Sequence, residues 1–259
     1  MLAQQRQASI LDRVRRTGGA RVADLVRVLG VSDMTIRRDI EALAERGLVA
    51  KVHGGAIAID GTTDEPGYAA KSEQQRAEKL AIARAAAELV KPGSAVGISA
   101  GTTTAALARE LVNVAELTVV TNSIPVADAL YHTGRPDQTV VLTGGIRTPS
   151  DALAGPVAEA AIGSLNVDVL FLGVHGMSAR TGFTTPNLME AGTNRLLVAA
   201  ARRLVVLADH TKWETVGIAT IAPLEDADVL ITDSGLPAEA RSQLSERVGE
   251  LVVVETATP

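Results

Sequence analysis

The chain has 259 residues, of which 46% are hydrophobic, 21% are charged and only 2% are aromatic, and it contains no cysteine. This composition supports one large core or two smaller ones and excludes global disorder. The absence of cysteine excludes disulfides and thiolate metal sites. With neither a signal peptide nor a membrane-spanning run in the sequence, we expect a soluble cytoplasmic protein with no membrane contact.

The charge is divided unevenly along the chain. Residues 1–57 carry ten Lys/Arg and six Asp/Glu, a net charge of +4, whereas the remaining residues carry a net charge of −9. A basic segment can contact phosphates, and an acidic remainder discourages non-specific binding of nucleic acid. The division predicts a DNA-binding domain followed by an acidic domain.

Two helices are predicted at the start of the chain. Residues 4–17 form the first, whose arginines, Arg6 among them, are expected to face mostly outward. Gly18-Gly19 ends this helix, and residues 22–29 form the second, shorter one.

The next stretch predicts the turn and second helix of a helix-turn-helix. Gly30 can adopt the positive φ that a tight turn requires, and Ser32 is a good N-cap. Ile36, Ile40 and Leu43 fall at i, i+4 and i+7, so they form one apolar stripe along the helix. The helix is therefore anchored along this side.

The opposite side of this helix carries arginine. At about 100° per residue, Arg38 lies opposite the stripe, while Thr35 and Arg37 flank it. In a major groove a guanidinium contacts guanine edges or phosphates, and a hydroxyl can contact either. An ordinary amphipathic helix with a solvated charged face is the alternative. We predict DNA contacts from Ser32, Met34, Thr35, Arg37 and Arg38.

A β-hairpin is predicted next, within residues 48–59. Two short β-like runs flank His53-Gly54-Gly55, which is typical of hairpin turns. Three helices and a hairpin make a winged helix-turn-helix over residues 1–59, with Lys51 and His53 placed to contact the DNA backbone or minor groove. His53 could instead be a turn residue whose ring merely packs.

Residues 60–70 have the composition of a linker, and residues 71–259 alternate helices with short apolar runs. The first helix of this part covers about 71–90. Continuous β-branched runs separated by helices predict an α/β domain, with a mainly parallel sheet covered on both faces. The predicted strands are residues 95–98, 117–120, 140–142, 167–174, 204–207, 229–231 and 251–254.

Polar, glycine-bearing or charged segments follow five of these strands. Ser99–Thr104 leads into a helix, whose N-terminal N–H groups can bind an anion. Each segment alone could be ordinary capping chemistry, but ligands of parallel sheets bind beyond the carboxyl ends of the strands, where these segments converge. The other four segments are Thr121–Ser123, Thr143–Arg147, Gly173–Gly176 with Gly182–Thr185 beyond it, and Ala208–Lys212.

The run Val31–Ile40, together with Leu43, Gly47-Leu48 and His53–Ala56, resembles the DeoR family of bacterial transcription regulators. The likeness extends to about Asp233. It implies an effector domain similar in fold to ribose-5-phosphate isomerase and coenzyme A transferases, which senses phosphorylated sugars. Lys51 stands where the family more often has arginine, so the charge is kept but the bidentate fork is lost.

The same resemblance implies which residues form the effector pocket, with Ser99–Thr103 as the phosphate loop. The family's loop is commonly Asp-Ser-Gly-Thr-Thr, so Ser99 and Ala100 depart from it, which argues against the usual sugar contact and for a different ligand. Asp168 could alternatively serve only at the start of its strand, and Glu190 and Lys212 could be surface charges. The implied pocket residues are Lys79, Ser99, Gly101, Thr102, Thr103, Thr121, Asn122, Gly144, Gly145, Arg147, Asp168, Gly173, Gly176, Glu190, Asp209 and Lys212.

These features predict a sequence-specific transcription regulator, a repressor of a carbohydrate-catabolism operon that a phosphorylated sugar releases. Expected partners are operator DNA, the sugar phosphate and further copies in a homodimer or homotetramer, since winged helices usually bind paired half-sites. We expect no enzymatic activity, cofactor or metal. The alternatives are a sugar-phosphate isomerase-like enzyme carrying a DNA-binding domain, with Asp168, Asp209 and Lys212 as acid–base candidates, and an architectural DNA-binding protein.

Overall fold

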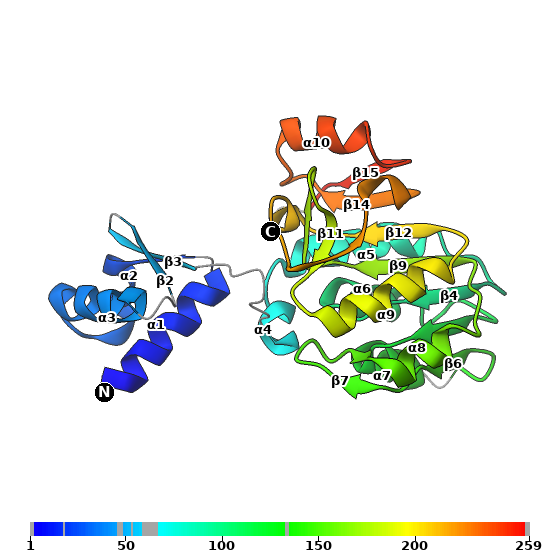
Figure 1. Ribbon diagram of the computed structural model, residues 1–259, viewed down its shortest axis with the longest axis horizontal. Helices are drawn as coiled ribbons and strands as arrows, with labels where there is room; N and C mark the ends of the chain where they lie inside the picture. The colour runs from blue at the N-terminus through cyan, green and yellow to red at the C-terminus, as the bar shows by residue number, and fades with distance from the viewer. Residues whose placement is uncertain are drawn as a thin grey trace. The chain divides into compact units, whose positions relative to one another are not determined.

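The computed structural model describes residues 3–17, 19–45, 49–52, 54–58, 67–132 and 135–256. The chain divides into two compact units, Met1–Gly61 and Thr62–Pro259, called the head and the body below. Figure 1 shows the head in blue and the body from cyan to red. Within the described residues, no helix is long and apolar enough to cross a membrane.

The head is a winged helix-turn-helix with a three-stranded antiparallel sheet in the order β1-β3-β2. β1 was not expected from the sequence: the first helix ends at Thr17, and residues 19–21 form a strand that pairs with β3 of the wing, with Ala20 opposite Ala56. The elements are α1 (Ala3–Thr17), β1 (Gly19–Arg21), α2 (Val22–Leu29), α3 (Asp33–Glu45), β2 (Val49–Val52) and β3 (Gly55–Ala58).

The turn and the apolar stripe of α3 are confirmed. Ile36, Ile40 and Leu43 are buried in the head's core against α1 and α2. Gly30 has a φ of 65° and donates its N–H to the Val26 carbonyl at 2.9 Å, which ends α2. The Thr35 N–H donates to Ser32 Oγ at 3.3 Å, so Ser32 caps α3 as predicted.

The outward placement expected for Arg6 is wrong. Its Nε donates to Asp39 Oδ2 at 2.5 Å, and Gln7 Nε2 donates to Asp39 Oδ1 at 3.2 Å. Asp39 is only 4% exposed, on the buried side of α3. A carboxylate removed from water needs a charged partner, and Arg6 supplies it.

The body is built on a seven-stranded sheet in the order β15-β14-β12-β9-β4-β5-β6, in which every pair is parallel. This confirms the predicted α/β class. The strands are β4 (Ala95–Ile98), β5 (Thr118–Thr121), β6 (Thr139–Leu142), β9 (Val169–Gly173), β12 (Leu204–Leu207), β14 (Val229–Asp233) and β15 (Leu251–Val254).

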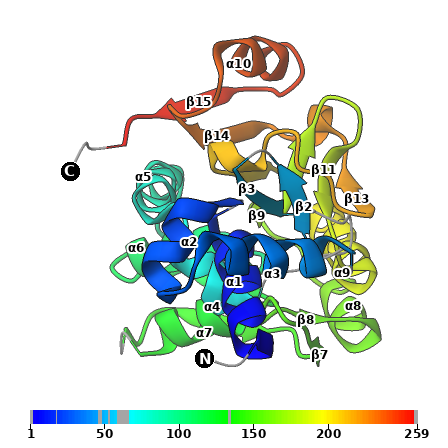
Figure 2. The same cartoon turned by 90° about the vertical axis from the view of Figure 1, so that its left-hand side faces the viewer.

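Helices cover both faces of this sheet. Phe171 packs on the side of α5, α6 and α7, while its neighbours Leu170 and Leu172 pack on the side of α8, α9 and α10. Figure 2 shows α5 and α6 on one side of the sheet and α8 and α9 on the other. The helices are α5 (Arg76–Ala87), α6 (Thr102–Glu110), α7 (Ile124–Tyr131), α8 (Pro156–Ile162), α9 (Leu188–Ala199) and α10 (Ala238–Ser245).

The single helix predicted over residues 71–90 is two helices. A short helix, α4 (Tyr68–Ser72), precedes α5, and Gln75 between them has a φ of 47° that breaks the helical path.

Smaller elements complete the body, and the sequence did not predict them as strands or 3-10 turns. An antiparallel sheet in the order β10-β11-β13 lies beside the carboxyl ends of the parallel strands. These elements are β7 (Ile146–Arg147), β8 (Leu153–Ala154), β10 (Gly176–Ser178), β11 (Gly182–Thr185), β13 (Ala219–Ala222), and the 3-10 turns η1 (His210–Lys212) and η2 (Leu224–Asp226).

Candidate functional sites

The first candidate site is the exposed face of α3. Ser32, Arg37 and Arg38 are exposed, and Met34 is 71% exposed. Arg37 holds an ion pair with Asp33, one turn earlier. Arg38 has no hydrogen-bond or ion-pair partner among the residues that the structure describes. The Arg38 guanidinium is therefore exposed, whereas that of Arg37 is engaged by Asp33.

Lys51 on β2 contributes a second cation to the head's surface. Its Nζ donates to Glu41 Oε1 at 2.6 Å, and this hydrogen bond lowers the pKa of the Glu41 carboxyl. Such an exposed pair contributes little to stability, so Lys51 can exchange it for a DNA phosphate at small cost. His53 lies outside the described residues.

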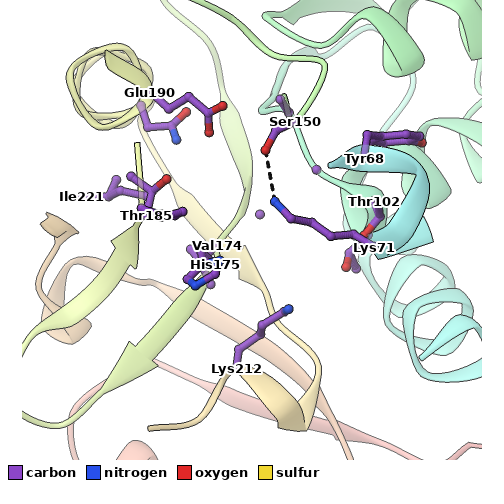
Figure 3. Close-up of a pocket in the computed structure, with 16 residues that line it drawn as sticks. Tyr68, Lys71, Thr102, Ser150, Val174, His175, Thr185, Glu190, Lys212 and Ile221 are labelled. Atoms are coloured by element: carbon purple, nitrogen blue, oxygen red, sulfur yellow. Dashed lines mark hydrogen bonds between the residues drawn. The ribbon is translucent and has the colours of Figure 1, made fainter. Parts of the chain in front are cut away.

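The second candidate site is a solvent-open cavity in the body, lined by residues of α4, α9, β11, η1 and the loops that follow β4 and β9 (Figure 3). It lies beyond the carboxyl ends of the parallel strands, where ligands of such sheets bind. The predicted residues that line it are Gly101, Thr102, Thr103, Gly173, Glu190 and Lys212.

The loop after β4 brings a helix N-terminus to this cavity. α6 begins at Thr102, and Gly101 has an extended backbone with a φ of 159°. The first N–H groups of a helix have no intrahelical acceptor, so they are available to an anion. A Cβ at Gly101 would lie 3.0 Å from Thr104 Oγ1 and 3.7 Å from the Cα of Gly173, so a side chain here would crowd the loop.

Ser99 does not line the cavity, contrary to the prediction. Its side chain is fully buried, and its Oγ accepts a hydrogen bond from the Gly173 N–H at 2.9 Å. This bond joins the ends of β4 and β9. The following residue, Ala100, lines the cavity with a methyl group.

Thr121 and Asn122 lie behind the loop that follows β4 and form hydrogen bonds to the backbone around it. Thr121 Oγ1 donates to the Ile98 carbonyl at 2.6 Å. Asn122 Oδ1 accepts from the Ala100 N–H at 3.0 Å, and its Nδ2 donates to the Leu153 carbonyl at 3.2 Å. Both side chains are fully buried, so they shape the loop and do not line the cavity.

Arg147 and Asp168 are held away from the cavity by other partners. Arg147 pairs with Asp151 at 2.6 Å on the surface. Asp168 precedes β9 and so lies at the amino ends of the strands, where its Oδ2 accepts from the Ala95 N–H at 3.0 Å and its Oδ1 pairs with Arg202. The alternative interpretation of Asp168, as a residue that serves the start of its strand, is the correct one.

Three predicted glycines have packing roles outside the cavity lining. Gly144 and Gly145 have φ values of 72° and 124°, and a Cβ at Gly145 would lie 2.8 Å from the Ala154 carbonyl oxygen. A Cβ at Gly176 would lie 2.0 Å from the Thr215 carbonyl oxygen. Close backbone approach accounts for Gly145 and Gly176, and the positive φ accounts for Gly144.

Lys79 and Asp209 are buried and do not line the cavity. Lys79 is 5% exposed, and its Nζ donates to the carbonyls of Lys71 and Gln74, each at 2.6 Å, so it anchors the end of α4. Burial lowers the pKa of Lys79 to about 8, although the Asp209 carboxylate opposes this. Asp209 Oδ1 accepts from the Thr211 N–H and hydroxyl.

Several lining residues were not predicted. Lys71 on α4 donates from its Nζ to Ser150 Oγ at 3.1 Å, the dashed line in Figure 3. No local pattern relates these two residues, which are 79 positions apart in the chain. His175 belongs to a strand end that the sequence did mark. The unpredicted polar lining residues include Tyr68, Lys71, Ser150, His175, Thr185 and Asn194.

The charge of the cavity is divided between its sides. Figure 3 shows Lys71 and Lys212 on different sides from Glu190. Lys212 Nζ has no hydrogen-bond or ion-pair partner within the described part of the chain. Glu190 accepts a hydrogen bond from the Thr148 hydroxyl. The described residues contain no group of three or more His, Cys, Asp or Glu side chains that could hold a metal ion.

A winged helix joined to an α/β domain with a polar cavity defines the class of DNA-binding regulators that carry a sensor domain. The family model of the DeoR-like helix-turn-helix domain matches residues 6–62, and that of the DeoR C-terminal sensor domain matches residues 74–234. The chain belongs to the DeoR family of transcriptional regulators.

Its relatives are similar over nearly their whole length. The HTH-type transcriptional regulator GlpR of Haloferax volcanii is 38% identical over 98% of both chains. GolR of Listeria innocua is 36% identical over 89% of this chain and 90% of its own. The HTH-type transcriptional repressor CsqR of Escherichia coli is 31% identical over 96% and 94%. These relatives are named as regulators, so the isomerase alternative is not supported.

Among solved structures, ribose 5-phosphate isomerase A of Methanocaldococcus jannaschii aligns with 53% of this chain and 54% of its own, at 20% identity and a TM-score of 0.38. At that score the likeness supports no assignment of function.

Proposed function

We propose that this regulator represses a carbohydrate-catabolism operon and is released when a phosphorylated sugar fills the cavity of the body. The observation that carries the proposal is the meeting of a helix N-terminus at Gly101–Thr103 with the cations Lys71 and Lys212 around one cavity. A repressor among the relatives, CsqR, supports the sign of regulation.

The anion end suits a phosphate group. A phosphate ester carries close to two negative charges at neutral pH. The positive end of the α6 dipole, the backbone N–H groups at its start and the Lys212 ammonium all favour that charge. The acidic body, at −9 outside residues 1–57, makes such a cationic spot selective for its ligand.

The head binds operator DNA in this proposal. Arg38, Arg37 and Met34 lie on the exposed face of α3, which would enter the major groove, and Lys51 of the wing would contact the backbone. Paired half-sites call for a homodimer or a homotetramer, which would act in the cytoplasm, where the operon is.

Thermal unfolding of the full chain tests the effector. At about 100 times Kd, a sugar phosphate should raise the free energy of unfolding by about 2.7 kcal/mol and shift the melting temperature upward. We expect the shift with ribose 5-phosphate or a hexose 6-phosphate and not with the matching free sugars.

Lys212→Ala should erase this shift, whereas Lys91→Ala removes an exposed lysine outside the cavity and should preserve it. A panel in which free sugars act as strongly as their phosphates, or in which no compound acts, would overturn the proposal.

A further inference from the structure

Asn194 is a buried polar group whose hydrogen-bonding capacity is incomplete. It lines the cavity from α9 and is only 6% exposed. Its Oδ1 has no hydrogen-bond partner among the described residues. A buried carbonyl oxygen without a donor costs free energy, so such groups are rare unless a ligand completes them.

Asn194 shares its side of the cavity with Glu190. The two residues are four positions apart on α9, so they lie one turn apart on the same face of the helix. Glu190 is also buried and is a hydrogen-bond acceptor, already contacted by the Thr148 hydroxyl. The oxygens on this side of the cavity are therefore acceptors, and one of them, Asn194 Oδ1, is buried without a donor among the described residues, whereas Lys71 and Lys212 carry donors elsewhere in the cavity.

A phosphate does not satisfy acceptors of this kind, because at neutral pH its oxygens are themselves mainly acceptors. A hydroxyl group does, because it donates a hydrogen bond and carries no charge. We propose that Asn194 recognises a hydroxyl group on the carbon chain of the effector and so determines which phosphorylated sugar the cavity accepts. This inference rests on the proposed function for the phosphate end.

Sites of this design reject analogues that lack the hydroxyl, because the protein acceptor is then left buried and unpaired. Ala100 is consistent with this division of roles. Its methyl group offers no hydrogen bond at the loop, so discrimination between sugars depends on other walls of the cavity.

Calorimetric titration of the full chain tests the inference with two probes. One is a sugar phosphate, either ribose 5-phosphate or a hexose 6-phosphate, whichever binds more tightly, and the other is inorganic phosphate. Asn194→Leu keeps a similar volume and removes the amide. It should weaken the binding of the sugar phosphate about tenfold and change the affinity for inorganic phosphate less than twofold. Asn113→Leu makes the same substitution at an exposed position and should change neither.

The unliganded melting temperature provides a second measurement. If a ligand normally supplies the partner of Asn194, then Asn194→Leu removes a buried carbonyl oxygen that has no donor among the described residues. The melting temperature should then be unchanged or higher. A lower melting temperature, together with an equal loss of affinity for both probes, would show that Asn194 has a structural role and would overturn the inference.

The remaining outcomes separate this inference from the proposed function. Unchanged sugar-phosphate binding in Asn194→Leu overturns the inference and leaves the phosphate end intact. If free ribose binds as tightly as ribose 5-phosphate, and Asn194→Leu weakens the binding of ribose, the proposed phosphate contact is overturned and the role of Asn194 is supported. Failure of every probe to bind the wild type overturns both.

Discussion

Arg37 and Arg38 are adjacent on α3 but differ in what they contact. Arg37 is paired with Asp33, while Arg38 is exposed and unpaired among the described residues. A guanidinium that gives up no internal partner loses least when it turns to a guanine. Arg38 is therefore the residue at which base recognition is most directly tested.

We expect Arg38→Ala to weaken operator binding by about 1–3 kcal/mol, the value of one bidentate base contact, without unfolding the head. A mobility shift with the DNA upstream of the protein's own gene measures this. Arg27→Ala removes the same charge from α2, where Arg27 pairs with Asp24 at 2.8 Å, and should have little effect. Equal affinity and selectivity for Arg38→Ala and the wild type would exclude the proposed contact.

At the scale of elements, the two aspartates of α3 have different roles. Asp39 is buried and joins α3 to α1 through Arg6 and Gln7, whereas Asp33 forms an exposed pair within α3. Breaking a buried pair leaves a charge without compensation, while an exposed pair contributes little.

Asp39→Ala should lower the melting temperature of the head by several degrees, and Asp33→Ala should leave it nearly unchanged. Circular dichroism on the full chain follows both variants, which make the same substitution on the same helix. Equal effects would mean that the contact of α1 with α3 does not depend on the Arg6–Asp39 pair.

The buried side chain of Lys79 contacts the end of α4, where its Nζ donates to the carbonyls of Lys71 and Gln74. Its pKa falls from 10.5 to about 8 in the folded protein. Between these two values the unfolded chain holds the proton and the folded chain has released it, so Lys79 makes stability rise with pH. The contribution is present above about pH 10.5 and is lost as the pH falls through 8.

The measurement is urea unfolding of the wild type and Lys79→Met from pH 7 to pH 10. The free energy of unfolding of the wild type minus that of Lys79→Met should increase as the pH rises across this window. Lys91→Met, at an exposed lysine, should give a constant difference. A difference that is flat or falling for Lys79→Met would contradict the lowered pKa.

At the scale of the whole molecule, the two units differ in the sign of their net charge. Residues 1–57 carry a net charge of +4, which favours DNA phosphates, whereas the remaining residues carry −9, which disfavours them. If the sugar phosphate lowers the affinity for DNA, linkage requires DNA to lower the affinity for the sugar phosphate by the same factor.

We expect a fragment of residues 1–61 to shift DNA weakly, with an affinity that falls steeply as salt rises, and a fragment of residues 62–259 not to shift it. Titration by fluorescence anisotropy at several salt concentrations compares them. A body fragment that binds DNA as tightly as the head would refute this division.

The sequence by itself determined the local features of this protein. The stripe of Ile36, Ile40 and Leu43, the turn at Gly30 and the parallel α/β class follow from helical spacing, backbone conformation and β-branched runs. These features depend on neighbours in the chain, and such patterns report which side of an element is buried.

Only the tertiary structure decided which side chains meet at the cavity. It brings Lys71 and Asn194 to the cavity from separate helices, turns Ser99 into the core and leaves Arg147 with Asp151 on the surface. It also places Asp168 at the far end of its strand. Spacing along the chain cannot show these outcomes, because they depend on how segments distant in sequence pack and on which partner each polar group finds when it is buried.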